Sequence, residues 1–320
     1  MNFIFKWLIY AILLLFFSTS YFGFAENGLY NKVKPSYVEI LVGGRLDGSG
    51  VILSESGLVA TAFHVVKKRQ KRIEALSESL GRLRLKYVAT NRGSDLALLS
   101  LPEKKEGYPY LRFANKIPEE GVEVFLMGSP IFRHSLLLRG TVARRAETYS
   151  WYDGAFTNTF PISGIAAPGT SGGPWINRDG EVFAIQVASV TTETGHQGVN
   201  SAVALSSIKS LVKNQRTVSV ATIEAAVEEL WGQSPYLIKE VPPHIKGLLF
   251  RQVSPQGVCG KAGIKDEDIL LSANGKTFER IETFMKFIRS FEIGTEMEFT
   301  VCDFKGKNKK VVTIELAELK

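Results

Sequence analysis

The sequence predicts a mainly β protein in which two β-barrels precede a small α+β domain. From Tyr37 onward, strand-length apolar runs alternate with glycine-rich turns, and the first clear helical pattern comes only at residues 206–214. These runs are too many for one small barrel, so we expect two barrels. After Asn214 the chain changes to short strands mixed with one amphipathic helix, which predicts a separate α+β domain.

The expected elements follow in order along the chain. Strand-like runs of the barrels lie in residues 37–43, 48–66, 71–90, 95–101, 122–130, 136–145 and 181–190. Ile208, Leu211 and Val212 then recur at helical spacing. In the last domain we expect a short helix or linker at 221–230, a turn at 242–247, strands at 247–253 and 266–276, a helix at 281–291 and a hairpin at 296–316 that turns at 305–308. The predicted domains therefore span residues 26–214 and 222–318.

The first 25 residues have the three parts of a secretory signal peptide. Lys6 precedes an apolar run at residues 7–17, and Gly23 and Ala25 give the small-x-small pattern that a signal peptidase recognises. The apolar stretch at residues 3–25 is also long enough for an uncleaved membrane anchor. Both interpretations put the working part of the chain outside the cytoplasm, as a periplasmic or secreted protein or as one anchored facing the periplasm.

Composition and charge argue against several classes of protein. The chain carries a net charge of +7, but its densest basic segment, residues 67–72, has no interleaved aromatic residues and no nucleic-acid-binding module around it. We interpret this segment as a solvated loop and expect no nucleic-acid partner. A Cys/His ligand cluster and a glycine-rich phosphate loop are both absent, so we expect no metal and no organic cofactor. Cys259 and Cys302 fit either one disulfide or two buried free thiols.

Residues 167–185, APGTSGGPWINRDGEVFAI, place a serine in a glycine-rich turn. Gly169, Gly172 and Gly173 leave the backbone free to turn tightly and to approach a ligand closely. Ser171 is therefore either a nucleophile or a polar residue of a surface turn, because glycine and serine are also common in ordinary loops. A nucleophilic serine needs a base and an orienting acid elsewhere in the chain.

Histidine is the usual base, and the chain has four. His64 follows an apolar strand-like run, which would put it at the rim of a barrel. Asp95 is the one charged residue at the head of a strongly apolar strand. His64, Asp95 and Ser171 follow the chain order known from two-barrel proteases, which favours a catalytic triad over three unrelated structural residues. The other histidines lie in loop-like or proline-rich segments and are interpreted as surface residues: His134, His196 and His244.

Several segments resemble trypsin-like serine proteases of the HtrA/Deg branch. They are GSGVIL and TAFHVV before and around His64, SDLALLSL around Asp95 and PGTSGGPWINRDGEVFAI around Ser171. Residues 247–276, GLLFRQVSPQGVCGKAGIKDEDILLSANGK, are similar to the PDZ domain of that family. The resemblance implies a chymotrypsin-like double β-barrel followed by a PDZ domain.

The resemblance also implies a role for each candidate residue. Ser171 would attack the scissile carbonyl, His64 would take and return the proton, and Asp95 would orient the imidazole. The backbone amides of Gly169 and Ser171 would form the oxyanion hole. The family's substrate pocket, which would accept small or medium aliphatic side chains, maps onto Ile185, Val187 and Ala188. The peptide groove of the PDZ domain maps onto Leu230, Trp231 and Gly232.

The function implied is that of an exported serine endopeptidase that cleaves misfolded or signalling proteins. Family members form homotrimers, and their PDZ domains bind C-terminal peptides that regulate the protease. An alternative from a different class is a PDZ-containing chaperone or binding protein in which the protease domain is mainly structural.

Overall fold

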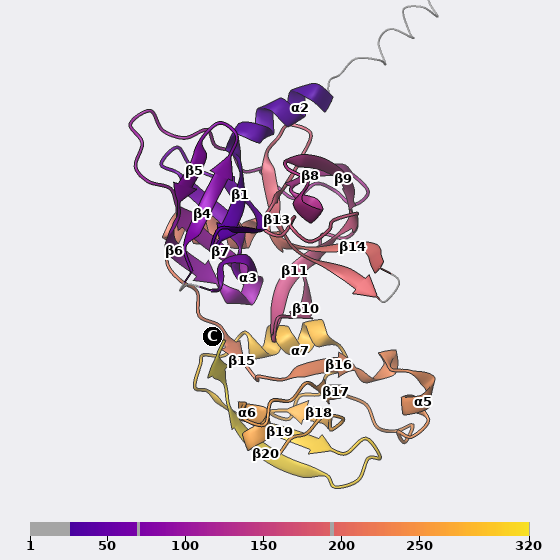
Figure 1. The fold of residues 1–320 in the computed structure, drawn as a ribbon. Helices are drawn as coiled ribbons and strands as arrows, with labels where there is room; N and C mark the ends of the chain where they lie inside the picture. Colours follow the sequence, from indigo (N-terminus) through magenta and orange to yellow (C-terminus); the bar gives the residue numbers. More distant parts are fainter. Residues whose placement is uncertain (1–25, 69–70, 193–194, 320) are drawn as a thin grey trace, which may run out of the picture.

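The protein is mainly β, as the sequence predicts (Figure 1). A computed structural model describes residues 26–68, 71–192 and 195–319, and the predicted signal peptide at residues 1–25 lies outside these ranges. Two seven-stranded sheets form the larger unit, and a five-stranded sheet forms the core of the smaller one. In the described part of the chain, no helix is long and apolar enough to cross a membrane.

The first sheet is a curled half-barrel with the strand order β5-β4-β1-β2-β3-β7-β6. In the described ranges no pairing joins the two outer strands, so this barrel is open. A short helix, α2 (Glu26–Val33), precedes it and buries Val33 against the barrels. The strands are β1 (Tyr37–Val42), β2 (Arg45–Ile52), β3 (Leu58–Ala62), β4 (Ile73–Ser77), β5 (Gly81–Arg84), β6 (Lys86–Asn91) and β7 (Leu96–Ser100).

The second sheet closes into a barrel, because β11 pairs with β9 as well as with β14. Its strand order is β10-β11-β14-β13-β12-β8-β9, and helix α4 (Leu205–Asn214) follows it where the sequence predicts a short amphipathic helix. Trp175, Phe160 and Phe183 fill its interior. The strands are β8 (Glu123–Gly128), β9 (Leu136–Val142), β10 (Thr148–Tyr152), β11 (Ala155–Gly164), β12 (Pro174–Ile176), β13 (Val182–Thr192) and β14 (Gly195–Ala204).

The C-terminal domain packs helix α7 (Ile281–Ile288) on a sheet in the order β16-β17-β18-β19-β20. Phe284, Met285 and Ile288 form the buried face of α7, as its amphipathic pattern predicts. The strands are β15 (Ala221–Thr222), β16 (Ala226–Glu229), β17 (Leu248–Arg251), β18 (Ile269–Ala273), β19 (Glu296–Cys302), β20 (Lys310–Glu315) and β21 (Ala317–Glu318). The short helices are α5 (Pro235–Ile238) and α6 (Val258–Lys261), with the 3-10 turn η4 at Leu230–Gly232.

The prediction of a helix or linker at residues 221–230 was wrong. The segment forms β15, which pairs with β21, and β16, which pairs with β17. Its alanines favour a helix locally, but Ala225 and Val227 are buried in the domain core, and this tertiary packing overrides the local preference.

The hairpin β10–β11 joins the two units. In Figure 1 it runs from the second barrel down to α7. Phe156 is buried in the core of the C-terminal domain, with the Trp151 ring 5.0 Å from its own. The Arg289 guanidinium, on the residue after α7, donates to the carbonyl oxygens of Phe156 at 3.0 Å and Ala221 at 2.6 Å.

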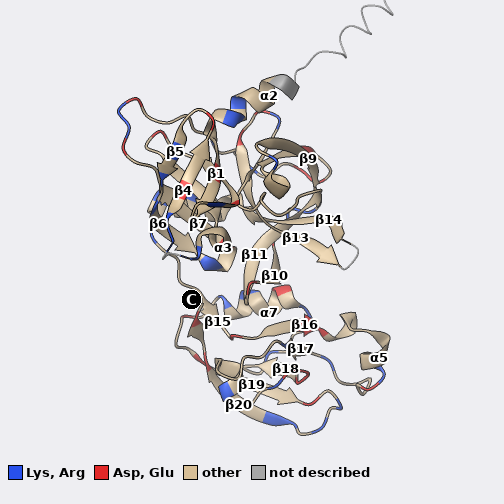
Figure 2. Ribbon diagram, viewed as in Figure 1, with Lys and Arg blue, Asp and Glu red and all other residues tan. Residues whose placement is uncertain are grey.

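Charged residues of both signs are spread over both units (Figure 2). Within the basic segment at 67–72, Lys67 pairs with Asp153 at 2.5 Å and Arg72 with Glu74 at 2.8 Å. Residues 69–70 of this segment lie outside the described ranges. At least part of its positive charge is therefore neutralised locally.

Candidate active site

A histidine and an aspartate are paired at the edge of the first sheet. The one-turn helix α3 (Phe63–Val66) follows β3 directly and carries His64. The imidazole Nδ1 lies 2.6 Å from Asp95 Oδ2, and the backbone N–H of His64 donates to Asp95 Oδ1 at 2.8 Å. Because a carboxylate only accepts hydrogen bonds, the proton of a neutral imidazole lies on Nδ1. The lone pair on Nε2 is then available to take a proton.

The backbone at Asp95 turns this carboxylate toward α3. Asp95 ends the 3-10 turn η2 (Arg92–Ser94) in the left-handed region, with φ 50° and ψ 44°, which aspartate tolerates better than most residues. Its carbonyl oxygen accepts the N–H of Phe63 at 2.9 Å. Asp95 is only 4% exposed, so the carboxylate is shielded from water on most sides.

The turn that carries Ser171 accepts only glycine at two positions. Gly172 has φ +85°, and a Cβ there would lie 2.1 Å from the carbonyl oxygen of Ser49. Gly169 has φ +104°, and a Cβ there would lie 2.3 Å from the carbonyl oxygen of Ser129. The glycines therefore allow the turn to pack closely against the first sheet and against the residue that follows β8. The Ser171 side chain then lies at the cavity between the barrels.

His64 and Ser171 line the same cavity, which has a volume of about 450 Å³. The Ser171 hydroxyl donates to the carbonyl oxygen of Val187 at 3.0 Å. Among the described residues, no hydrogen bond joins Ser171 to His64. The structure thus brings the three predicted residues to one site, with the serine hydroxyl turned away from the imidazole.

Two backbone amides of the same turn have no acceptor within the described part of the protein: those of Gly169 and Ser171. The Pro168 carbonyl oxygen accepts the N–H of Ile131 at 2.8 Å. Since the peptide is trans, this bond points the Gly169 N–H away from Ile131. Both amides belong to residues that line the cavity, so they are available to a bound oxygen.

The predicted substrate-pocket residues divide between the cavity and the core. Val187 and Ala188 line the cavity, but Ile185 is fully buried among apolar side chains of the barrels. Ile185 therefore belongs to the core rather than to the pocket wall. The neighbouring Gln186 lines the cavity instead, with its Nε2 donating to the Ala188 carbonyl oxygen at 2.9 Å and its Oε1 accepting from Trp175 Nε1 at 2.8 Å.

Two further cavity residues were missed by sequence reasoning. His196, interpreted as a surface loop residue, lies on β14 opposite Thr191, and its Nε2 is 3.2 Å from Asn200 Oδ1. Tyr152 ends β10, and its ring meets the His64 ring edge-on with centroids 5.1 Å apart. Burial raises the pKa of the Tyr152 hydroxyl, which therefore stays neutral. Neither residue carries a local sequence signal, because both reach the site through hairpin pairing.

The residues predicted for the peptide groove lie on the 3-10 turn η4 of the C-terminal domain. Leu230 is buried, while Trp231 is 60% exposed and donates from Nε1 to the Glu279 carbonyl oxygen at 3.0 Å. Both line a cavity of about 220 Å³ together with Ile238, Val241 and Ile245. Gly232 belongs to the same 3-10 turn but does not line this cavity.

Both cysteines are buried free thiols. Burial raises the pKa of Cys259 to about 12 and that of Cys302 to about 11. In the described ranges, no group of three or more His, Cys, Asp or Glu side chains has a geometry that could hold a metal ion.

Comparison with known proteins finds a matching domain family and relatives among serine endoproteases. A family model described as a trypsin-like peptidase domain matches residues 48–185. A probable periplasmic serine endoprotease, DegP-like, from Pseudomonas putida (strain W619) is 30% identical over 274 residues, covering 83% of this chain and 55% of the relative. Its counterpart in Brucella suis biovar 1 is 25% identical over 285 residues, covering 86% and 53%. The chain thus spans about half the length of these relatives.

Solved structures share the fold. An HtrA-type protease AlgW with a tripeptide has a TM-score of 0.60 at 18% identity, covering 91% of this chain and 96% of that one. A serine endoprotease from Yersinia pestis has a TM-score of 0.60 at 21% identity, covering 93% and 99%. Together, the matched domain and the sequence relatives make this chain a relative of the HtrA/Deg-type serine proteases, with a trypsin-like peptidase domain.

Proposed function

We propose that the protein is an exported serine endopeptidase that uses Ser171, His64 and Asp95 as its catalytic triad. One observation carries the proposal: one cavity is lined by Ser171, by a histidine that is paired with a buried aspartate, and by the two residues whose backbone amides are unpaired. The location outside the cytoplasm follows from residues 1–25 and from the periplasmic relatives.

In this mechanism, the Ser171 hydroxyl first leaves the Val187 carbonyl oxygen and donates to His64 Nε2. His64 accepts the proton as Ser171 attacks the substrate carbonyl, and Asp95 stabilises the imidazolium that forms. The carbonyl oxygen becomes negative and accepts from the amides of Gly169 and Ser171, each worth roughly 3–4 kcal/mol in the transition state. His64 then returns the proton to the leaving amine. Turning the hydroxyl toward His64 is therefore the activating step.

The substrates would be unfolded or partly folded segments of proteins, entering the cavity with a small or medium side chain beside Val187 and Ala188. The C-terminal domain would act as a PDZ domain that binds C-terminal peptides, with the cavity at Leu230 and Trp231 as the candidate groove. A homotrimer is the oligomer that the family resemblance implies.

The nucleophile is tested with a fluorophosphonate probe, which forms a covalent bond with an activated serine, and with casein as an unfolded substrate. Full-length protein should be labelled at Ser171 and should cleave casein after aliphatic residues, as mapped by mass spectrometry. Ser171→Ala should abolish labelling and lower cleavage by about 10⁴-fold or more. Ser189→Ala is the matched control, because Ser189 lines the same cavity without facing a base.

Labelling at a residue other than Ser171, or equal cleavage by Ser171→Ala, would rule out this nucleophile. If C-terminal peptides bind the protein and neither labelling nor cleavage occurs with them, the alternative of a PDZ-containing chaperone or binding protein is favoured. The bond from Ser171 to Val187 is the observation that keeps this second function in view.

A further inference from the structure

A row of buried hydroxyl groups lies behind the turn that carries Ser171. Tyr37 comes from β1, Ser49 from β2, and Ser129 directly follows β8. All three are buried, and Ser49 and Ser129 are completely inaccessible to solvent. Burying three hydroxyls is unfavourable unless each finds partners, so their arrangement needs a structural reason.

The hydroxyl oxygens form a chain of close contacts that ends at the turn. The Tyr37 hydroxyl lies 2.8 Å from Ser49 Oγ and 2.7 Å from Ser129 Oγ. Ser49 Oγ donates to the carbonyl oxygen of Gly169 at 2.7 Å, and the Ser49 backbone N–H donates to the carbonyl oxygen of Ser171 at 2.8 Å. Because the Ser49 hydroxyl proton goes to Gly169, Ser49 Oγ can only accept from its other neighbours, the Tyr37 hydroxyl and the Ser129 backbone N–H at 3.3 Å.

Ser49 therefore holds two of the four peptide groups between Pro168 and Gly172. The other two are held by Ile131, which donates to the Pro168 carbonyl oxygen at 2.8 Å, and by Gly173, which donates to that of Thr170 at 2.9 Å. The orientation of each peptide group sets the direction of the N–H on its far side. The amides of Gly169 and Ser171 belong to the two groups held by Ile131 and Gly173. Ser49 therefore acts on them through the neighbouring peptide groups, which flank that of the Ser171 amide on both sides.

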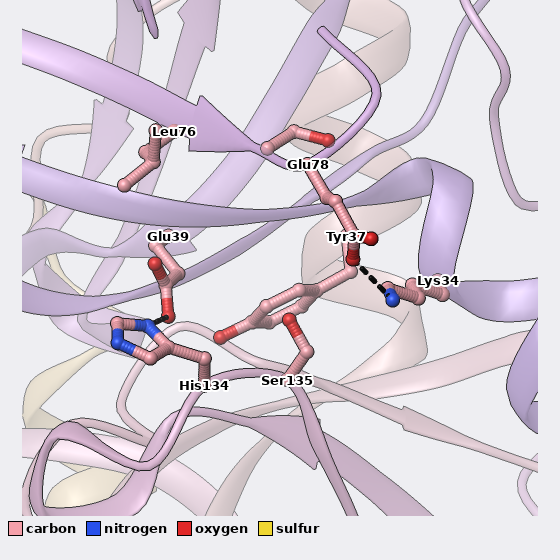
Figure 3. Close-up of a pocket in the computed structure, with 8 residues that line it drawn as sticks. Lys34, Tyr37, Glu39, Leu76, Glu78, His134 and Ser135 are labelled. Carbon is pink, nitrogen blue, oxygen red and sulfur yellow. Dashed lines mark hydrogen bonds and ion pairs between the residues drawn. The ribbon is translucent and has the colours of Figure 1, made fainter. Parts of the chain in front are cut away.

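The opposite end of the chain is a carboxylate at the base of a second cavity, of about 270 Å³ (Figure 3). Ser129 Oγ donates to Glu39 Oε1 at 2.5 Å, and His134 Nδ1 lies 2.7 Å from the same oxygen. The Glu39 side chain is only 6% exposed, whereas that of His134 is 70% exposed and covers it from the solvent side. Glu39 anchors Ser129, and Ser129 in turn contacts Tyr37.

We propose that Tyr37 and Ser49 are positioning residues that fix the oxyanion-hole amides of Gly169 and Ser171. The Ser49 side chain acts through the Gly169 carbonyl oxygen, and Tyr37 acts through Ser49. The proposal rests on the proposed protease function, since the amides matter only if an oxyanion forms there. Burial raises the pKa of Tyr37 above its ordinary value, so its hydroxyl keeps its proton.

Tyr37→Phe and Ser49→Ala test the proposal by removing one hydroxyl each. Each should lower kcat with little change in KM, because the amides act on the transition state. We expect about a two- to ten-fold fall for Tyr37→Phe. We expect a larger fall for Ser49→Ala, within the roughly 10²- to 10³-fold loss seen when an oxyanion donor is removed. The fall in kcat of the double variant should be smaller than the product of the two single falls, because the two hydroxyls act in one chain.

Tyr108→Phe is the matched control. Tyr108 is also buried in the first unit, and its hydroxyl donates to the Pro102 carbonyl oxygen at 2.8 Å, away from the turn. It should lower the melting temperature much as Tyr37→Phe does but leave kcat unchanged. A purely structural role for Tyr37 predicts the same kcat for both variants.

Backbone hydrogen exchange of residues 164–173 gives a readout that does not depend on activity. Exchange should become faster in Tyr37→Phe and Ser49→Ala but not in Tyr108→Phe. Unchanged exchange in both variants, or equal kcat effects in Tyr37→Phe and Tyr108→Phe, would overturn the positioning role. If the wild-type protein is neither labelled nor active, the proposed protease function fails. Faster exchange in the two variants would still support the role of Tyr37 and Ser49 in holding the turn. If Tyr37→Phe does not fold, Ser49→Ala carries both readouts.

Discussion

At the scale of single residues, the site depends on one backbone conformation. Asp95 reaches His64 with both carboxylate oxygens because its backbone is left-handed just before β7. Asparagine adopts this conformation as readily as aspartate does. Asp95 can therefore be changed to asparagine with its backbone intact, which separates its chemical role from its structural one.

Asp95→Asn should lower kcat by about 10⁴-fold while the protein stays folded. The amide cannot stabilise an imidazolium, and its NH₂ group can favour the tautomer with the proton on Nε2, which cannot act as a base. Casein cleavage and circular dichroism measured on the same samples check both parts. A variant that unfolds, or one that keeps more than a tenth of the activity, would contradict this role.

The two thiols should resist alkylation in the native protein. A thiol reacts as its thiolate, and with the pKa of Cys259 raised to about 12, only about one molecule in 10⁴ is ionised at that site at pH 8. Iodoacetamide at pH 8 should add no mass to the native protein and two adducts after denaturation in urea, as measured by intact mass spectrometry. Rapid modification of the native protein would show that the thiols are accessible.

At the scale of elements, the sequence indicates strands wherever apolar runs are bounded by glycine turns, as in β1, β3, β7 and β8. It also indicates His64, Asp95 and Ser171, because each of them lies in a recognisable local sequence motif. It could not indicate that Tyr152 and His196 line the site, or that Tyr37, Ser49 and Ser129 contact one another. These residues are brought together only by the pairing and packing of strands. For the same reason β16 was misassigned, and Ile185 was predicted in the pocket although it lies in the core.

The Ser171 turn should be the element least tolerant of a side chain. Gly172→Ala would place a Cβ 2.1 Å from the Ser49 carbonyl oxygen at a positive φ, so we expect a loss of about 3 kcal/mol or more in the free energy of unfolding. Gly81→Ala is the control: φ is also positive, but the Cβ meets open space, and the loss should be about 1 kcal/mol. Urea unfolding compares the two variants, and equal losses would contradict the steric argument.

At the scale of the whole molecule, the two units are joined by contacts that neither could make alone. Phe156 of the barrel hairpin is part of the C-terminal core, and Arg289 binds carbonyl oxygens on both sides of the junction. Burial lowers the pKa of Arg289 to about 10, so the guanidinium is still charged at neutral pH. Thr148 adds a bond to Glu282 at 3.0 Å.

Arg289→Ala should weaken this junction by about 2–3 kcal/mol, because it leaves two buried carbonyl oxygens without their charged donor. In calorimetry, we expect the C-terminal domain to melt earlier and separately from the barrels. Arg280→Ala, on the exposed residue before α7, should leave the profile unchanged. A single unshifted transition in Arg289→Ala would mean that the junction does not depend on this side chain.

Within a few residues, the hairpin β10–β11 contacts both the candidate active site and the core of the C-terminal domain. Tyr152 packs against His64, and Phe156 packs inside the C-terminal domain. During evolution, a substitution here is selected for its effects on both at once. The hairpin should therefore accept fewer amino acids than other surface hairpins of this protein, and its changes should appear in pairs with changes in α7.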